Sequence, residues 1–122
     1  MKKAVPLPAL TKKAVVVFNG YIRRRDAGLG CISCGGSVDH AGHYFAAGHY
    51  SALKFHTMNV NGQCVGCNNY KHGNLIHYRQ GLVRKYGADN VAALENSANL
   101  RKVHKWSRFE LETIIDLYKS KV

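Results

Sequence analysis

The sequence predicts an α+β fold in which a small zinc-stapled core of two strands and one helix (ββα) is flanked by N- and C-terminal helices. Two Cys-x-x-Cys motifs, Cys31/Cys34 and Cys64/Cys67, match a closed tetrahedral zinc site. The 29 residues between them hold four of the seven histidines and short strand-like runs. The segments on either side carry apolar residues at helical spacing.

The length of 122 residues fits a single domain. We expect four segments along it: an extended leader, an N-terminal helix, the zinc-bound core and a helical tail, at residues 1–10, 11–27, 31–80 and 81–122. Pro6 and Pro8 favour the extended leader, and Thr11 is a plausible N-cap for a helix over Lys12–Asp26. That helix would bury Val15, Phe18 and Ile22.

The core and the tail are predicted from the same kinds of signal. Strand-like runs lie at residues 37–45 and 53–55, the second as a short strand or a loop. From Cys64 the chain is expected to turn into a helix that Gly73-Asn74 interrupts. Further helices are expected at residues 75–86, 88–95 and 108–121, with a basic connector at residues 96–105.

The charge of the chain indicates a polyanionic partner. Lys and Arg number 18 against 7 Asp and Glu, which gives a formal net charge of +11 and makes nucleic acid the first candidate. A membrane partner is not expected, because the sequence shows no clear basic amphipathic helix and no apolar run long enough to span a bilayer. The N-terminus does not read as a signal peptide, so we expect a cytoplasmic protein in which paired Cys-x-x-Cys motifs bind metal rather than form disulfides.

The polar residues between the motifs have a recognisable order. His43 in the first strand, Asn59 five residues before the second Cys-x-x-Cys and Asn68 directly after it together resemble the HNH, or ββα-metal, nuclease pattern. The resemblance implies an HNH-like core with one divalent ion between strand and helix. A histidine that titrates near neutrality can accept a proton from water, and an amide oxygen suits a hard cation such as Mg²⁺ or Mn²⁺.

A closer resemblance is to the phage NinG/Rap recombination endonucleases. The motifs that carry it run in order, at Phe18–Ala27, Cys31–Cys34, Ala41–Tyr44, Leu53–Phe55, Asn59–Cys64, Cys67-Asn68, Gly73-Asn74 and Tyr78-Arg79. The tail around Trp106 and Glu110 resembles the C-terminal helices of that family less specifically. The resemblance implies a metal-dependent endonuclease that cuts branched DNA such as Holliday junctions and D-loops in the host cell cytoplasm. Junction-cutting enzymes commonly act in pairs, so a homodimer is a further expectation.

The identity of the base has an alternative. Many HNH proteins carry Asp-His, with the aspartate as metal ligand and the histidine as base, whereas here Gly42 precedes His43. Asp39-His40 is a literal Asp-His, so a second register makes His40 the base and Asp39 the ligand. We favour His43 as base and Asn68 as ligand, with Asn59 orienting the loop that carries the base.

Basic residues in three regions are the candidate phosphate contacts. They lie in the first helix, around the core and in the connector: Arg23, Arg24, Arg25, Lys54, Lys71, Arg79, Arg101, Lys102 and Lys105. A non-catalytic zinc-stapled DNA-binding protein is the competing interpretation of the same residues. In that case His43 and Asn59 are ordinary hydrogen-bonding residues of the hairpin. As a separate alternative, the run Arg23–Arg25 is a solvated helix face and not a DNA contact.

Overall fold

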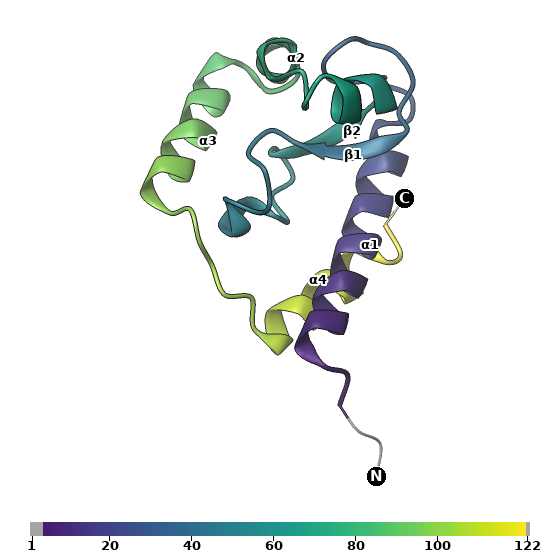
Figure 1. Cartoon of the computed structure of the whole chain (residues 1–122), viewed down its shortest axis with the longest axis vertical. Coiled ribbons are helices and arrows are strands. Elements are labelled where there is room, and N and C mark those ends of the chain that lie inside the picture. The colour runs from purple at the N-terminus through teal and green to yellow at the C-terminus, as the bar shows by residue number, and fades with distance from the viewer. Residues whose placement is uncertain (1–3, 122) are drawn as a thin grey trace.

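The computed structural model describes residues 4–121, which form a two-stranded sheet and four α-helices with short helical turns (Figure 1). The elements in chain order are α1 (Leu7–Asp26), β1 (His40–His43), the 3₁₀ turn η1 (Ser51–Leu53), β2 (Val60–Gln63), the π-helical turn η2 (Gly66–Tyr70), α2 (Leu75–Tyr86), α3 (Ala88–Leu100) and α4 (Arg108–Tyr118). This confirms the prediction of a mixed fold with a small sheet and four neighbouring cysteines.

The two strands form one antiparallel hairpin. His40 lies opposite Gln63 and His43 opposite Val60. Because side chains alternate between the faces of a strand, His40 and Gln63 share one face of the sheet, and His43 and Val60 share the other.

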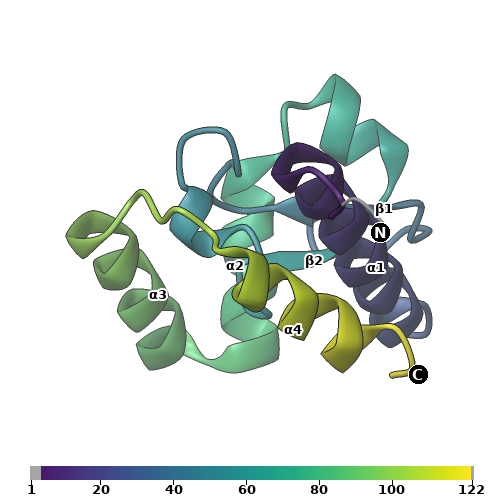
Figure 2. The same ribbon diagram turned by 90° about the horizontal axis from the view of Figure 1, so that it is seen from below.

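Two apolar clusters hold the helices on the hairpin. The first joins α1, α4 and the hairpin through Leu10, Ala14, Phe18, Ile22, Phe55, Val60, Leu111 and Ile115. Figures 1 and 2 show α4 running beside α1 in both views. The second cluster joins α2 and α3 to the loop between the strands, through Leu53, Tyr78, Leu82, Val91, Leu94 and Ala98. Gly81 lets α2 approach the first Cys-x-x-Cys loop, because a Cβ at this position would lie 1.9 Å from the carbonyl oxygen of Ile32.

A buried polar network joins the end of α1 to β2 and α2. Asp26 is 1% exposed, and its carboxylate accepts hydrogen bonds from Arg25 Nε at 2.7 Å, Lys85 Nζ at 3.0 Å and the backbone N–H of Gly62 at 2.8 Å. Lys85 also donates to Asn61 Oδ1 at 2.9 Å. The two cations and one backbone donor satisfy a carboxylate that would otherwise be costly to bury.

The N-terminal boundary differs from the prediction. The helix begins at Leu7, with Pro6 as its N-cap residue, so residues 7–10 are not part of an extended leader; residues 1–3 lie outside the described part. Proline is tolerated in the first helical turn because the N–H groups there have no intrahelical acceptor. Thr11 is not the N-cap, since its hydroxyl donates to the carbonyl oxygen of Leu7 from inside the helix.

Four other boundaries also differ, one of them at the last helix, which ends at Tyr118 rather than at residue 121. The first strand is limited to His40–His43, and the second strand is Val60–Gln63, while residues 53–55 continue from a 3₁₀ turn. The third helix runs to Leu100 rather than ending at residue 95, because Ala98 continues the buried stripe of Val91 and Leu94. The basic connector is correspondingly shorter.

Candidate functional site

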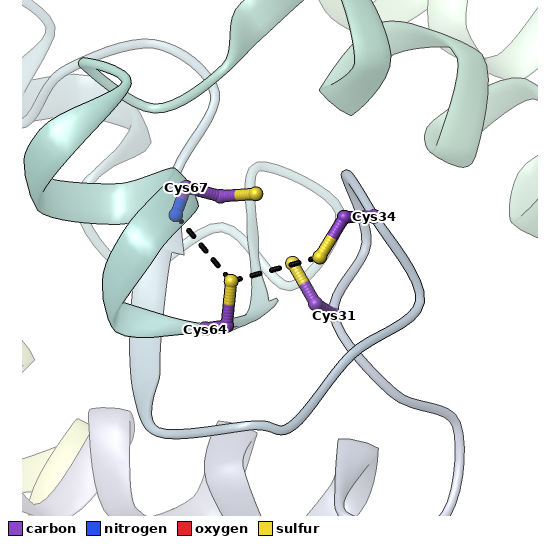
Figure 3. Close-up of side chains that lie close together, drawn as sticks. All are labelled: Cys31, Cys34, Cys64 and Cys67. Carbon is purple, nitrogen blue, oxygen red and sulfur yellow. Dashed lines mark hydrogen bonds between the residues drawn. The ribbon is translucent and has the colours of Figure 1, made fainter.

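The two Cys-x-x-Cys motifs fold into turns that aim their sulfurs at a common point (Figure 3). In the first, Gly35 adopts a φ of +78° and donates its N–H to the carbonyl oxygen of Cys31 at 2.8 Å. In the second, Asn68 N–H donates to the carbonyl oxygen of Cys64 at 3.0 Å, and Cys67 N–H donates to Cys64 Sγ at 3.4 Å. The backbone thus fixes both pairs of thiols.

The four sulfurs have the spacing of a tetrahedral metal site. All four Sγ atoms lie within 4.8 Å of one another, and those of Cys34 and Cys64 are 3.6 Å apart. Zinc–sulfur bonds of about 2.3 Å in a tetrahedron require sulfur–sulfur separations of about 3.8 Å. The donor set and the geometry therefore fit zinc.

The two cysteines of the second motif differ in pKa. A hydrogen bond from the Cys67 N–H lowers the pKa of Cys64 to about 7. Burial raises the pKa of Cys67 to about 12, although Asn74 Nδ2 donates to its sulfur at 3.5 Å. A divalent ion at the centre favours the thiolate form of every ligand, including the buried one.

His43 is held as a neutral imidazole with a defined tautomer. Its Nε2 lies 3.1 Å from the carbonyl oxygen of Lys54, and because a carbonyl only accepts, Nε2 carries the hydrogen and Nδ1 keeps its lone pair. Burial lowers the pKa of His43 and outweighs the hydrogen bond to the Lys54 carbonyl, which acts to raise it; the positive charge of Lys54 also lowers it. A neutral histidine with one available lone pair can accept a proton.

Asn59 positions the loop that holds His43. Its fully buried side chain accepts from Phe45 N–H at 2.8 Å and donates to the carbonyl oxygens of Phe45 and Leu53, both at 3.1 Å. These bonds tie the start of the loop after β1 to its end, next to Lys54, whose carbonyl orients His43.

Asn68 lies beside both candidate histidines. Its Nδ2 is 3.1 Å from His40 Nδ1, and Asn68 shares with His43 a cleft of about 320 Å³ that is also lined by Ala41, Ala46, Ala47, His72 and Gly73. Asp39 is exposed and absent from this lining; its Oδ2 accepts from Ser37 Oγ and from Val65 N–H, each at 3.0 Å. Asn68 thus contacts His40 and shares a cleft with His43, whereas the Asp39 carboxylate bonds the backbone of Val65 inside the second motif.

The candidate phosphate contacts divide into exposed residues and residues that already bond or pack against other groups of the protein, which we call committed. Arg25 is committed, because its Nε, Nη1 and Nη2 are all bonded inside the molecule, to Asp26, Thr57, Val60 and Asn61. These bonds leave Arg25 less available for a phosphate than its neighbour Arg23. Arg79 pairs with Glu95 at 2.9 Å, Lys102 lies over the ring of Tyr50, Arg101 contacts His104 and Arg24 bonds the carbonyl oxygen of Lys121. Arg23, Lys71 and Lys105 are exposed, and Lys54 is half-buried.

Sequence reasoning missed several residues that shape the cleft. Tyr78 is fully buried and donates its hydroxyl to the carbonyl oxygen of Gly42 at 2.7 Å, which holds the backbone just before His43. His72 lines the cleft from a left-handed backbone conformation with a φ of 49°. Gln63 packs against Gly42 from the neighbouring strand. Of the three, His72 lines the cleft, whereas Tyr78 and Gln63 contact Gly42 through tertiary packing, which leaves no spacing signal in the sequence.

No helix formed by residues 4–121 combines the length and the apolar character needed to cross a bilayer.

Comparison with known proteins gives a consistent result. The family model described as "Bacteriophage Lambda NinG protein" matches residues 1–122. Proteins named "Protein ninG" from Escherichia phage lambda and Salmonella phage P22 are each 37% identical over 114 residues, which is 91% of this chain and 54% and 55% of those proteins. The same-named protein of Enterobacteria phage H19B is 37% identical over 106 residues. The chain spans about half the length of these relatives, and no solved structure matches it.

Proposed function

We propose that this chain, which belongs to the NinG family of phage proteins, is a metal-dependent DNA endonuclease with an HNH-like active site. The observation that carries the proposal is the placement of His43, whose Nε2 lies against the Lys54 carbonyl and whose side chain lines a cleft shared with Asn68. The cleft adjoins the β1–β2 hairpin. The four cysteines hold this hairpin against the turn that follows it.

His43 acts as the general base in this proposal. Its Nδ1 accepts the proton of the attacking water, and the Nε2 hydrogen bond to the Lys54 carbonyl keeps the ring oriented and stabilises the imidazolium that forms. Asn59 acts through the loop rather than on the substrate. His40 is a weaker candidate, because the Asn68 amide lies against its Nδ1.

A divalent ion, Mg²⁺ or Mn²⁺, would neutralise charge on the scissile phosphate when bound. Among the candidate ligands, Asn68 lines the cleft and offers a neutral amide oxygen suited to such an ion. Asp39 is the less suitable ligand, since its carboxylate already accepts the Val65 N–H outside the lining. We assign zinc at the four cysteines a structural role, because four protein ligands leave no open position for substrate.

DNA is the proposed substrate, with branched recombination intermediates such as Holliday junctions and D-loops as its class. The formal charge of +11 supports an electrostatic contribution to binding. Exposed Arg23, Lys71 and Lys105 are the proposed phosphate contacts with fewest internal commitments. The branched substrate rests on the resemblance to NinG/Rap endonucleases. The proposal also includes that the protein acts as a homodimer in the cytoplasm of the host cell.

A non-catalytic zinc-stapled DNA-binding protein is the second candidate, and the charge supports it equally. Cleavage separates the two. Purified protein is incubated with an end-labelled four-way junction and a linear duplex of matched sequence, with Mg²⁺, with Mn²⁺ and with EDTA. The endonuclease proposal requires ion-dependent cutting of the junction in preference to the duplex. Binding of both DNAs without cutting under any of these conditions supports the second candidate.

A further inference from the structure

Gln63, the last residue of β2, has a fixed side-chain orientation. Its fully buried amide donates from Nε2 to the carbonyl oxygen of Gly73 at 2.7 Å and to Ser33 Oγ at 2.9 Å. Since the carbonyl of Gly73 can only accept, Nε2 must face it and Oε1 must point the other way. Within residues 4–121, no donor reaches Oε1, and it is the sole buried side-chain nitrogen or oxygen in that state.

The orphan oxygen occupies the place that a Cβ on Gly42 in β1 would take. A Cβ on Gly42 would lie 1.8 Å from Gln63 Oε1 and 3.1 Å from Asn68 Oδ1. Both distances start from the same hypothetical Cβ position, so the two oxygens are at most 4.9 Å apart. Asn68 directs its Nδ2 to His40, and in the described part of the chain no hydrogen bond reaches its Oδ1. Two acceptor oxygens from neighbouring side chains thus lie close together, and in the described part of the chain neither receives a hydrogen bond.

A cation satisfies both oxygens where no hydrogen-bond donor does. Bonds of about 2.1 Å to Mg²⁺ in octahedral geometry place two ligand oxygens about 3 Å apart in cis or about 4.2 Å apart in trans, within the limit above. Both oxygens belong to neutral amides, which suit a hard divalent ion but supply no charge, so the affinity should be weak, on the order of 10⁻⁴–10⁻³ M.

We propose that Gln63 Oε1 and Asn68 Oδ1 together hold the divalent ion, with Gln63 supplying from β2 the oxygen that no side chain at Gly42 can supply. The inference rests on the proposed function for the role of the ion, whereas ion binding itself is measurable without DNA. Gly42 is then required for space, since any Cβ there would displace the Gln63 amide.

The test observes side-chain amides of the ¹⁵N-labelled wild-type chain by NMR. Added Mg²⁺ should shift the Gln63 and Asn68 amide pairs, and substoichiometric Mn²⁺ should broaden both before those of exposed Gln80, the matched glutamine on α2. Broadening of Asn68 with Gln63 unaffected at saturation overturns the proposal. In that case Oε1 only packs on the Gly42 Cα–H.

Variants supply a second readout through Mn²⁺ titration followed by electron paramagnetic resonance. Gln63→Met should weaken Mn²⁺ binding at least tenfold, whereas Gln80→Met should leave it unchanged. Equal affinity in folded Gln63→Met and wild-type chains contradicts the inference. If Gln63→Met does not fold, the wild-type NMR experiment still decides. Ion binding at both amides without cleavage of any DNA would uphold this inference while refuting the endonuclease.

Discussion

Replacing Asp26 with asparagine should destabilise the fold strongly, because Asp26 is the only anion bonded to Arg25 and Lys85 in the described network. The side chain of Asp26 is 2% exposed, and those of Arg25 and Lys85 are 20% and 21% exposed. Asparagine keeps the shape and one acceptor oxygen, but its NH₂ group cannot accept from Arg25 Nη2 and Gly62 N–H, which both bond Oδ2. Leaving two cations without their counter-ion should cost about 3–5 kcal/mol.

Urea unfolding followed by circular dichroism at constant zinc measures this cost. Asp116→Asn is the control, since Asp116 is exposed and pairs with Lys119 at 3.3 Å; it should change the free energy of unfolding by less than about 0.5 kcal/mol. Adding Lys85→Met to Asp26→Asn should recover part of the loss, because one of the two uncompensated cations is removed. A loss below about 1 kcal/mol for Asp26→Asn would refute the reasoning.

The same network predicts a pH dependence. Burial acts to raise the pKa of Asp26, but hydrogen bonds from Arg25, Gly62 N–H and Lys85 outweigh it and hold the pKa below its usual 3.8. The stabilisation is therefore present in full well above the unfolded-state pKa, and it is lost as the pH falls through the folded-state pKa. The stability difference between wild type and Asp26→Asn should stay constant near neutrality and shrink in acid.

Three further predictions concern the metal, the DNA and the base. Metal analysis should return one tightly held zinc per chain, and Cys64→Ser should fold poorly because a structural site contributes about 10 kcal/mol or more; unchanged melting would count against the site. A plot of log DNA affinity against log salt concentration should become less steep by about 0.9 for each phosphate contact that Arg23→Ala or Arg24→Ala removes. A slope equal to that of the wild type would mean that both arginines are solvated and contact no phosphate. Burial lowers the pKa of His43, so the acid limb of the cleavage rate should have its midpoint below pH 6.5; a midpoint above it would contradict a buried neutral base.

Local signals in the sequence predicted much of the fold. The apolar spacing of Phe18 and Ile22 placed α1, and the two Cys-x-x-Cys motifs placed the four sulfurs together. Ser107 and Glu110 form a reciprocal capping box at the start of α4, consistent with the predicted helix start. These features depend on residues a few positions apart, or on a ligand set whose chemistry is distinctive.

Other features depend on residues far apart in the chain. Arg25 follows two exposed arginines, and nothing in that run distinguishes it, yet it bonds Asn61 and the carbonyl oxygen of Val60 across the fold. The face that Gln63 presents to Gly42 depends on strand register, and the strand itself was predicted at residues 53–55. Tertiary contacts determine both the hydrogen bonds of Arg25 and the face of the strand on which Gln63 lies, so composition and periodicity could not predict them.

The central claim is that His43 activates water, and the cleavage rate of His43→Ala tests it most directly. Single-turnover cutting of a labelled four-way junction in Mg²⁺ should fall about 10²-fold or more relative to wild type, while junction affinity in EDTA stays the same. His40→Ala is the matched control and should retain most of the rate. Undiminished cutting by His43→Ala would contradict the account, and loss of cutting in His40→Ala alone would move the base to His40.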